Sequence, residues 1–178
     1  AEAMKSLPDV VAKTLTDDRI ALYQHLASLN RSKHDFFIIG RGQDYAAGCE
    51  GAMKIKEVSY LHCESYAAGE LKHGTISLIE PGTLVIALGT YGPLFDKAMS
   101  NVVEVQARGA NVLALTTETH RDAMAARTPR VLTVPDVEPM LLPQLGVAPL
   151  QLLAYYIALE RGCDIDKPRN LAKSVTVE

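Results

Sequence analysis

Short, continuously apolar segments alternate with helical segments along most of this chain. Strands that are buried on both faces of a parallel sheet read as unbroken apolar runs, whereas half-exposed antiparallel strands alternate apolar and polar residues. We therefore expect a doubly wound, three-layer αβα sandwich with about five parallel strands. The predicted strands are residues 36–39, 61–64, 84–88, 111–115 and 130–134.

Helix signals fill the intervals between these strands. The first two helices begin at Pro8 and at Asp17, and the second ends near Leu29. A long apolar helix over residues 139–162 has a kink or a restart at Pro149. The remaining predicted helices are residues 44–59, 65–73, 93–108 and 118–126.

The composition excludes several classes of protein. Of the 178 residues 48% are hydrophobic and 22% are charged, and the net charge is −3. Nucleic-acid binding needs a clustered basic excess, which this chain lacks. No apolar run approaches the roughly 20 residues that cross a bilayer, so we expect no membrane partner. The three cysteines form no CxxC or zinc pattern, which favours reduced thiols and a cytoplasmic protein.

The first candidate ligand site is the turn Gly40-Arg41-Gly42-Gln43, which follows a predicted strand. Ligands of open α/β sheets bind beyond the carboxyl ends of the strands. The glycine spacing does not match a dinucleotide fingerprint, and a tight strand-to-helix turn is the favoured interpretation. The alternative is an anion held by the free N–H groups of the following helix.

Glu50, Lys54 and Glu57 are spaced by four and three residues, which places them on one face of the helix predicted over 44–59. The simpler interpretation is a solvated face with ordinary ion pairs. The other interpretation is catalytic, because a carboxylate can move a proton between adjacent carbons while an ammonium stabilises the developing oxyanion. The spacing alone leaves both interpretations open.

The segment HCESYAAGELKHG, residues 62–74, concentrates ionisable side chains between two predicted strands. His73 suits the C-terminal end of a helix, where the helix dipole favours a cation. The spacing matches no zinc-ligand pattern, and we predict no metal site and no cofactor. Lys173 shows no signal of its own, because a terminal lysine is normally solvated.

Three stretches together carry a specific resemblance, namely EGAMKIKEVSY at 50–60, HCESYAAGELKHG at 62–74 and PRNLAKSVTVE at 168–178. In order and spacing they are similar to the second sugar-isomerase (SIS) domain of the glucosamine-6-phosphate synthases, the isomerizing glutamine–fructose-6-phosphate aminotransferases. The resemblance runs from about Leu7 to Glu178 and implies a doubly wound fold. It further implies lead-in helices over 1–30, an SIS domain over 31–163 and a C-terminal catalytic tail over 164–178.

Members of this family convert fructose 6-phosphate into glucosamine 6-phosphate with ammonia that a separate domain releases from glutamine. The resemblance implies that Glu57 binds the open-chain sugar and shuttles a proton between its C1 and C2 atoms. It implies that Lys54 assists at the neighbouring oxygen and that His73 opens the sugar ring in the site of the partner subunit. Lys173 would form a Schiff base with the sugar carbonyl, beside a backbone contact from Ala172.

The resemblance also implies partners. The turn at 40–43 lacks the family's Ser- and Thr-rich phosphate loop, so a first SIS domain is expected to hold the phosphate. A glutaminase domain would supply ammonia, and the chain would form a homodimer. The isolated chain is then expected to have little or no activity. Thr75 stands where the family has a proline, outside these roles.

Two hypotheses from other classes remain beside this one. The first is a non-catalytic sugar-phosphate-binding or regulatory SIS module, and the second is a dimerisation scaffold with an incidental polar cluster. The combination of Lys54, Glu57, His73 and Lys173 argues against a sensor, which does not need all four side chains.

Overall fold

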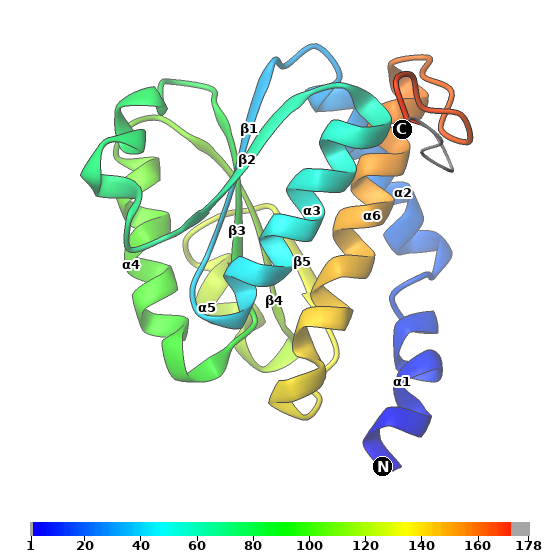
Figure 1. The fold of residues 1–178 in the computed structure, drawn as a ribbon. Coiled ribbons are helices and arrows are strands. Elements are labelled where there is room, and N and C mark those ends of the chain that lie inside the picture. The colour runs from blue at the N-terminus through cyan, green and yellow to red at the C-terminus, as the bar shows by residue number, and fades with distance from the viewer. Residues whose placement is uncertain (1, 172–178) are drawn as a thin grey trace, which may run out of the picture.

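Within the described residues, five parallel strands form one sheet (Figure 1). The computed structural model describes the backbone of residues 2–171 and the side chains of residues 4–171. The strand order is β2-β1-β3-β4-β5, and every pairing is parallel. The strands are β1 Asp35–Gly40, β2 His62–Ala67, β3 Leu84–Gly89, β4 Asn111–Thr117 and β5 Val131–Val134. The predicted doubly wound α/β sandwich is confirmed.

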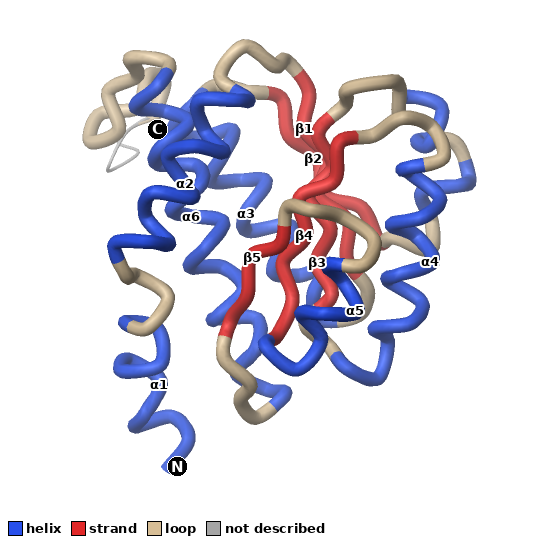
Figure 2. Tube along the Cα trace, turned by 180° about the vertical axis from the view of Figure 1, so that it is seen from behind, coloured by secondary structure: helices blue, strands red, loops and turns tan. Residues whose placement is uncertain are grey.

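Helices cover both faces of the sheet and make two cores (Figure 2). Successive side chains of a strand point to opposite faces. In β1, Phe36 and Ile38 therefore join one core, while Phe37 and Ile39 join the other. The first core lies under α2 Asp17–Asn30, α3 Gln43–Ser59 and α6 Leu142–Glu160, and the second under α4 Phe95–Gln106 and α5 Arg121–Ala125.

The N-terminal helix begins earlier than the sequence suggested. α1 spans Glu2–Ala12, so Pro8 lies inside it and does not start it. A proline removes one backbone donor but does not by itself end a helix whose apolar face is packed. Val10 and Val11 of α1 pack against the first core.

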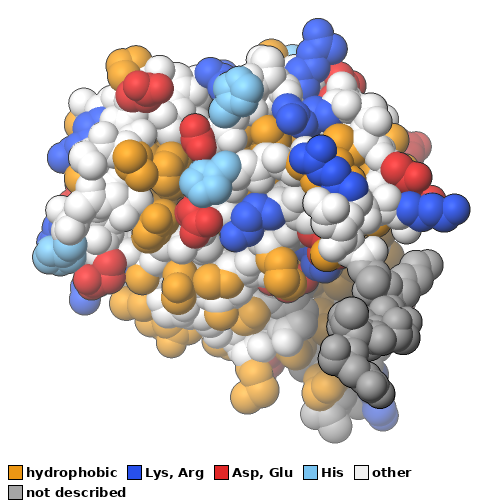
Figure 3. Space-filling view, turned by 45° about the horizontal axis from the view of Figure 1, so that its top comes forward, with side chains coloured by type: hydrophobic (Ala, Val, Ile, Leu, Met, Phe, Trp, Pro, Cys, Tyr) orange, Lys and Arg blue, Asp and Glu red, His pale blue; other side chains and the backbone are white. Residues whose placement is uncertain are grey.

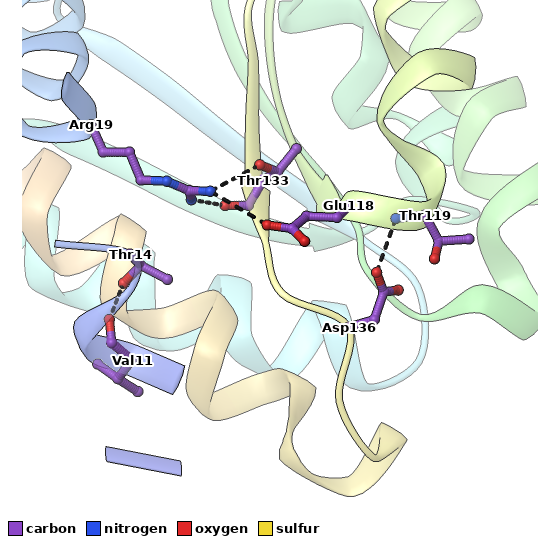
Figure 4. A network of polar contacts seen from close by, with 7 residues as sticks. All are labelled: Val11, Thr14, Arg19, Glu118, Thr119, Thr133 and Asp136. Carbon is purple, nitrogen blue, oxygen red and sulfur yellow. Dashed lines mark hydrogen bonds and ion pairs between the residues drawn. The ribbon is translucent and has the colours of Figure 1, made fainter. Parts of the chain in front are cut away.

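Arg19 links α2 to β5, at the edge of the sheet (Figure 4). Its guanidinium donates hydrogen bonds to the carbonyl and, at 3.3 Å, to the hydroxyl of Thr133 on β5. The same group lies 3.7 Å from a carboxylate oxygen of Glu118. Asp136 accepts the Thr119 amide at 3.0 Å and holds the loop after β4 next to the loop after β5.

The helix predicted over residues 65–73 is wrong. β2 continues through Ala67, and Ser65 and Tyr66 pair with Ile38 and Ile39 of β1. Ser65 is a common helix N-cap residue, but a helix there would leave the backbone groups at the edge of β1 without partners, so strand pairing is favoured. Two short 3-10 helices, Leu71–His73 and Thr75–Leu78, follow the strand.

α6 is the most apolar helix of the fold and runs without a break through Pro149. It packs between α2 and α3. The predicted restart at Pro149 does not occur, because the proline lies inside the one continuous helix. The segment Pro139–Glu160 is long and apolar enough to cross a membrane by length and composition, yet half of it is buried inside the fold. Its apolar character thus has a structural explanation as a core helix.

The close approach of α3 to α6 depends on Gly51. A Cβ at this position would lie 2.5 Å from Leu150 Cδ1 and 3.0 Å from Leu150 Cβ. A Cβ at Gly146, on α6, would meet only Ala47 Cβ, at an ordinary 3.7 Å.

Gly51→Ala is therefore expected to lower the free energy of unfolding by about 1 kcal/mol, because overpacking outweighs the better helix propensity of alanine. Gly146→Ala is the matched control and is expected to raise it by up to about 1 kcal/mol. Urea unfolding of both variants measures the difference. Equal stabilisation by the two changes would contradict the tight contact at Gly51.

Candidate functional site

The exposed face of α3 carries an ammonium–carboxylate pair near the C-terminal end of the helix. Lys54 Nζ donates to Glu57 Oε2 at 2.6 Å and lies 3.9 Å from Glu50 Oε1. The side chains of Lys54 and Glu57 are 30% and 32% exposed, so the pair is half-buried but open to a ligand. The predicted sharing of one helix face is confirmed.

The charge state of Lys54 defines what the pair can do. The hydrogen bond to Glu57 raises the pKa of Lys54 above its usual value of 10.5; burial acts in the opposite direction, and the charges of Glu57 and Glu50 add to the increase. Lys54 is consequently an ammonium at neutral pH and can stabilise an oxyanion but cannot accept a proton. Glu57 is the member of the pair that can take a proton from a bound molecule.

Two neighbouring grooves open beside this pair. Glu57 lines a groove of about 570 Å³ between the end of α3 and the C-terminal segment; Met53, Lys56, Tyr60, Arg169, Asn170 and Leu171 complete it. Lys54 lines a second groove, of about 530 Å³, between α3 and α6. The second groove is largely apolar, with Val11, Val58, Leu152 and Tyr155 among its lining residues.

His73 lies far from the Lys54–Glu57 pair within one chain. Glu57 precedes the amino end of β2, whereas His73 follows the carboxyl end of the same strand. His73 is exposed, with Nε2 3.8 Å from Glu70 Oε2. α3 covers the first core, whereas Leu71, in the same 3-10 helix as His73, belongs to the second. The fold thus places these two predicted site residues on opposite faces of the sheet.

The start of the polar segment 62–74 lies at the amino edge of the sheet. At the amino edge His62 Nδ1 lies 2.8 Å from Asp35 Oδ1, and its Nε2 lies 3.5 Å from Glu64 Oε1. Histidine and charged side chains gather on this side of the molecule (Figure 3). A cavity of about 660 Å³ opens there between Asp35, His62 and Glu80. No group of three or more His, Cys, Asp or Glu residues in the described part of the chain could hold a metal ion.

The switch point of the sheet, between the carboxyl ends of β1 and β3, holds a carboxylate of the chain itself. Asp44, in the first turn of α3, is buried and accepts the amides of Thr90 at 3.0 Å and Tyr91 at 3.1 Å, together with the Thr90 hydroxyl. A Cβ on Gly40 would lie 2.7 Å from the Asp44 carbonyl carbon. The segment 40–43 is thus a tight strand-to-helix turn, as predicted, and the Asp44 carboxyl group takes up the amides of Thr90 and Tyr91 in the loop after β3.

Two of the predicted site residues, Ala172 and Lys173, lie outside the described residues. Tyr60 and Arg169, which sequence analysis did not single out, line the same groove as Glu57. The Arg169 amide donates to Tyr60 Oη at 2.8 Å, and its guanidinium carbon lies 4.1 Å from the centre of the Tyr60 ring. The spacing from Glu57 to Tyr60 is the only local signal, because residues three apart share a helix face.

Comparison with known proteins agrees with the observed fold. A family model described as "SIS domain" matches residues 28–161. A glutamine–fructose-6-phosphate aminotransferase (isomerizing) from Clostridium acetobutylicum is 53% identical over 175 residues, which is 98% of this chain and 28% of the relative. The same-named protein of Clostridium tetani is 51% identical over 177 residues, 99% of this chain and 29% of the relative.

A solved structure extends the match to three dimensions. The C-terminal domain of glucosamine-fructose-6-phosphate aminotransferase from Francisella tularensis superposes with a TM-score of 0.87 at 30% identity, over 93% of this chain and 46% of that one. The chain spans less than a third of the length of the curated relatives it matches. Because the family model covers the sheet and the helices on both of its faces, the chain belongs to the SIS domain family.

Proposed function

We propose that this chain is the second SIS unit of a glucosamine-6-phosphate synthase and contributes half of its isomerase site. The substrate is fructose 6-phosphate and the product is glucosamine 6-phosphate. The observation that carries the proposal is the Lys54–Glu57 hydrogen bond at 2.6 Å, whose carboxylate partner lines the same groove as the last described residue, Leu171. The names of the curated relatives support the same reaction.

Glu57 and Lys54 divide the proton transfer between them. Glu57 takes a proton from C1 of the open-chain sugar and returns it at C2, so that C1 is oxidised and C2 is reduced with no net change in oxidation state. Negative charge that develops on the neighbouring oxygen is stabilised by the Lys54 ammonium. The half-buried position strengthens that electrostatic contribution relative to bulk water.

Lys173 forms the first imine in this proposal. Its amine attacks the C2 carbonyl of the open-chain sugar, the C–N bond forms and water leaves. Ammonia then adds to C2 and the Lys173 amine leaves, and the resulting C2 imine acidifies the C1 hydrogens as an electron sink. Lys173 follows Leu171 by two residues, and two residues span at most about 7 Å of extended chain. Ala172 contributes a backbone contact to the sugar.

The remaining parts come from other units. His73 is too far from Glu57 within one chain, so we assign it to ring opening in the site of a partner subunit of a homodimer. A first SIS domain holds the phosphate, since Asp44 occupies the switch point of this unit. A glutaminase domain supplies ammonia, and the isolated chain has little or no activity.

The proposal retains the boundaries 1–30 for the lead-in helices, 31–163 for the SIS unit and 164–178 for the catalytic tail. It also assigns the protein to the cytoplasm. The three cysteines, Cys49, Cys63 and Cys163, are free thiols, which suits a reducing compartment.

Borohydride trapping tests the proposal on the full-length protein. Reduction of the imine in the presence of fructose 6-phosphate is expected to leave a stable sugar-phosphate adduct on the peptide that contains Lys173, found by mass spectrometry. Lys173→Arg is expected to abolish the adduct, and Lys56→Arg, a change at the edge of the groove, to leave it in place. An adduct on another lysine, or none, overturns the assignment.

A further inference from the structure

The end of α3 and the C-terminal segment meet in an unusual backbone arrangement. Tyr60 and Asn170 are the only non-glycine residues in the described part of the chain with positive φ, at 59° and 63°. Both line the groove that contains Glu57. A bulky residue rarely adopts this conformation, and where it does the surrounding contacts hold it there.

Tyr60 makes two different contacts to the same residue of the C-terminal segment. Its hydroxyl oxygen accepts the backbone amide of Arg169 at 2.8 Å, which fixes the main chain. Its ring lies under the Arg169 guanidinium at 4.1 Å, a cation–π contact that fixes the side chain. The positive φ of Tyr60 ends α3, with its amide bonded to the Lys56 carbonyl at 3.2 Å.

A second attachment fastens the start of the same segment. Arg161, just after α6, donates from Nε to the Ser59 carbonyl at 3.1 Å and from Nη1 to the Arg31 carbonyl at 2.7 Å. The segment is therefore held at its beginning by Ser59 and near its described end by Tyr60. Figure 1 shows it folded over the C-terminal ends of α3 and α6.

We propose that Tyr60 is a positioning residue that docks the C-terminal segment through Arg169, beside the groove that Glu57 lines. The inference rests on the proposed function for its catalytic consequence. A segment that is held at Arg169, four residues before Lys173, samples fewer conformations, so the Lys173 amine reaches a higher effective concentration at the groove. Tyr60 touches neither substrate nor reacting atoms in this role.

The test uses the full-length protein with Tyr60→Phe and Tyr60→Leu. Phenylalanine keeps the ring and loses the acceptor, whereas leucine loses both contacts. Hydrogen exchange of the peptide that contains Arg169 is expected to accelerate about tenfold in Tyr60→Leu and less in Tyr60→Phe. Peptides from α3 and the sheet are expected to exchange at unchanged rates, which separates a lost dock from a destabilised fold.

A second set of measurements on the same variants gives the rate of borohydride trapping at Lys173 and the kinetic constants. In Tyr60→Leu the trapping rate and kcat are expected to fall about tenfold with little change in KM for fructose 6-phosphate, because the phosphate is bound elsewhere. Tyr60→Phe is expected to recover part of the loss. Tyr45→Phe and Tyr45→Leu, at the exposed N-terminal end of α3, are the matched controls and are expected to change neither readout.

The outcomes distinguish this inference from the proposed function. If no sugar is trapped at Lys173 in the wild-type protein, the proposed function is overturned. Hydrogen exchange of the peptide that contains Arg169 then still tests whether Tyr60 docks the C-terminal segment. Trapping and local exchange that are unchanged in Tyr60→Leu overturn the docking role while the imine at Lys173 stands. If Tyr60→Leu does not fold, Arg169→Met removes the cation–π contact from the other side and is expected to accelerate local exchange several-fold.

Discussion

Replacement of Glu57 by glutamine is expected to slow the formation of glucosamine 6-phosphate by about 10²–10⁴-fold, the usual contribution of a general acid–base group. Glutamine keeps the shape of the side chain and can still accept the hydrogen bond from Lys54, now 2.6 Å long. It cannot take the C1 proton. The measurements are the steady-state rate of the full-length protein and the exchange of the sugar C1 hydrogen with solvent deuterium.

Glu50→Gln is the matched control on the same helix. Glu50 also faces Lys54, but at 3.9 Å and without the short hydrogen bond. Removal of a half-exposed charge at that distance is expected to change the rate by less than about threefold. Undiminished product formation and deuterium exchange in Glu57→Gln would favour the non-catalytic sugar-phosphate module over the isomerase.

Asp44→Ala is expected to lower the free energy of unfolding by about 3 kcal/mol, because it leaves several buried donors without an acceptor. The carboxylate joins the start of α3 to the loop after β3 through the amides of Thr90 and Tyr91. Urea unfolding measures the loss. The fully exposed Asp122 is the control, and Asp122→Ala is expected to stay within about 0.5 kcal/mol of the wild type.

The same carboxyl group predicts a dependence of stability on pH. Burial raises the pKa of Asp44 above its usual value of 3.8, although the Thr90 hydroxyl and the Tyr91 and Thr90 amides act in the opposite direction. The folded chain therefore binds this proton more tightly than the unfolded chain does. The stabilisation is fully present below pH 3.8 and is lost as the pH rises through the raised pKa of the folded state.

Asp44→Asn cannot titrate and serves as the reference for this effect. The difference in unfolding free energy between the wild type and Asp44→Asn is expected to shrink as the pH rises from about 4. Unfolding curves at a series of pH values test it. A difference that stays constant, or grows, with rising pH would contradict a raised pKa at Asp44.

The strands were predictable because burial on both faces of a parallel sheet leaves a local mark on the sequence. The run 84–88, for example, is observed as β3 Leu84–Gly89, in which every residue is buried. The helix predicted over residues 65–73 was wrong because the structure of this segment depends on a distant part of the chain. Ser65 reads locally as a helix cap, and only its pairing with Ile38, 27 positions earlier, makes it part of a strand.

The contacts of the candidate site likewise fall into local ones, which the sequence predicts, and long-range ones, which it does not. Glu50, Lys54 and Glu57 meet because helical spacing alone brings them together, so the sequence predicts that contact. Asp44 and Tyr60 depend on hydrogen bonds to residues 46 and 109 positions away. No local pattern reports such partners, since a buried aspartate and an exposed one look alike in a sequence.

The sequence by itself determined the class of fold, the Lys54–Glu57 pair and the resemblance that names a reaction, because helix and strand periods and short motifs are local properties. The tertiary structure decided what that pair faces. It brought Arg169, Asn170 and Leu171 beside Glu57, placed His73 on the opposite face of the sheet and filled the switch point with Asp44. The physical reason is that the chain leaves the face covered by α3 when it passes through β2, while the distant C-terminal segment returns to the end of α3.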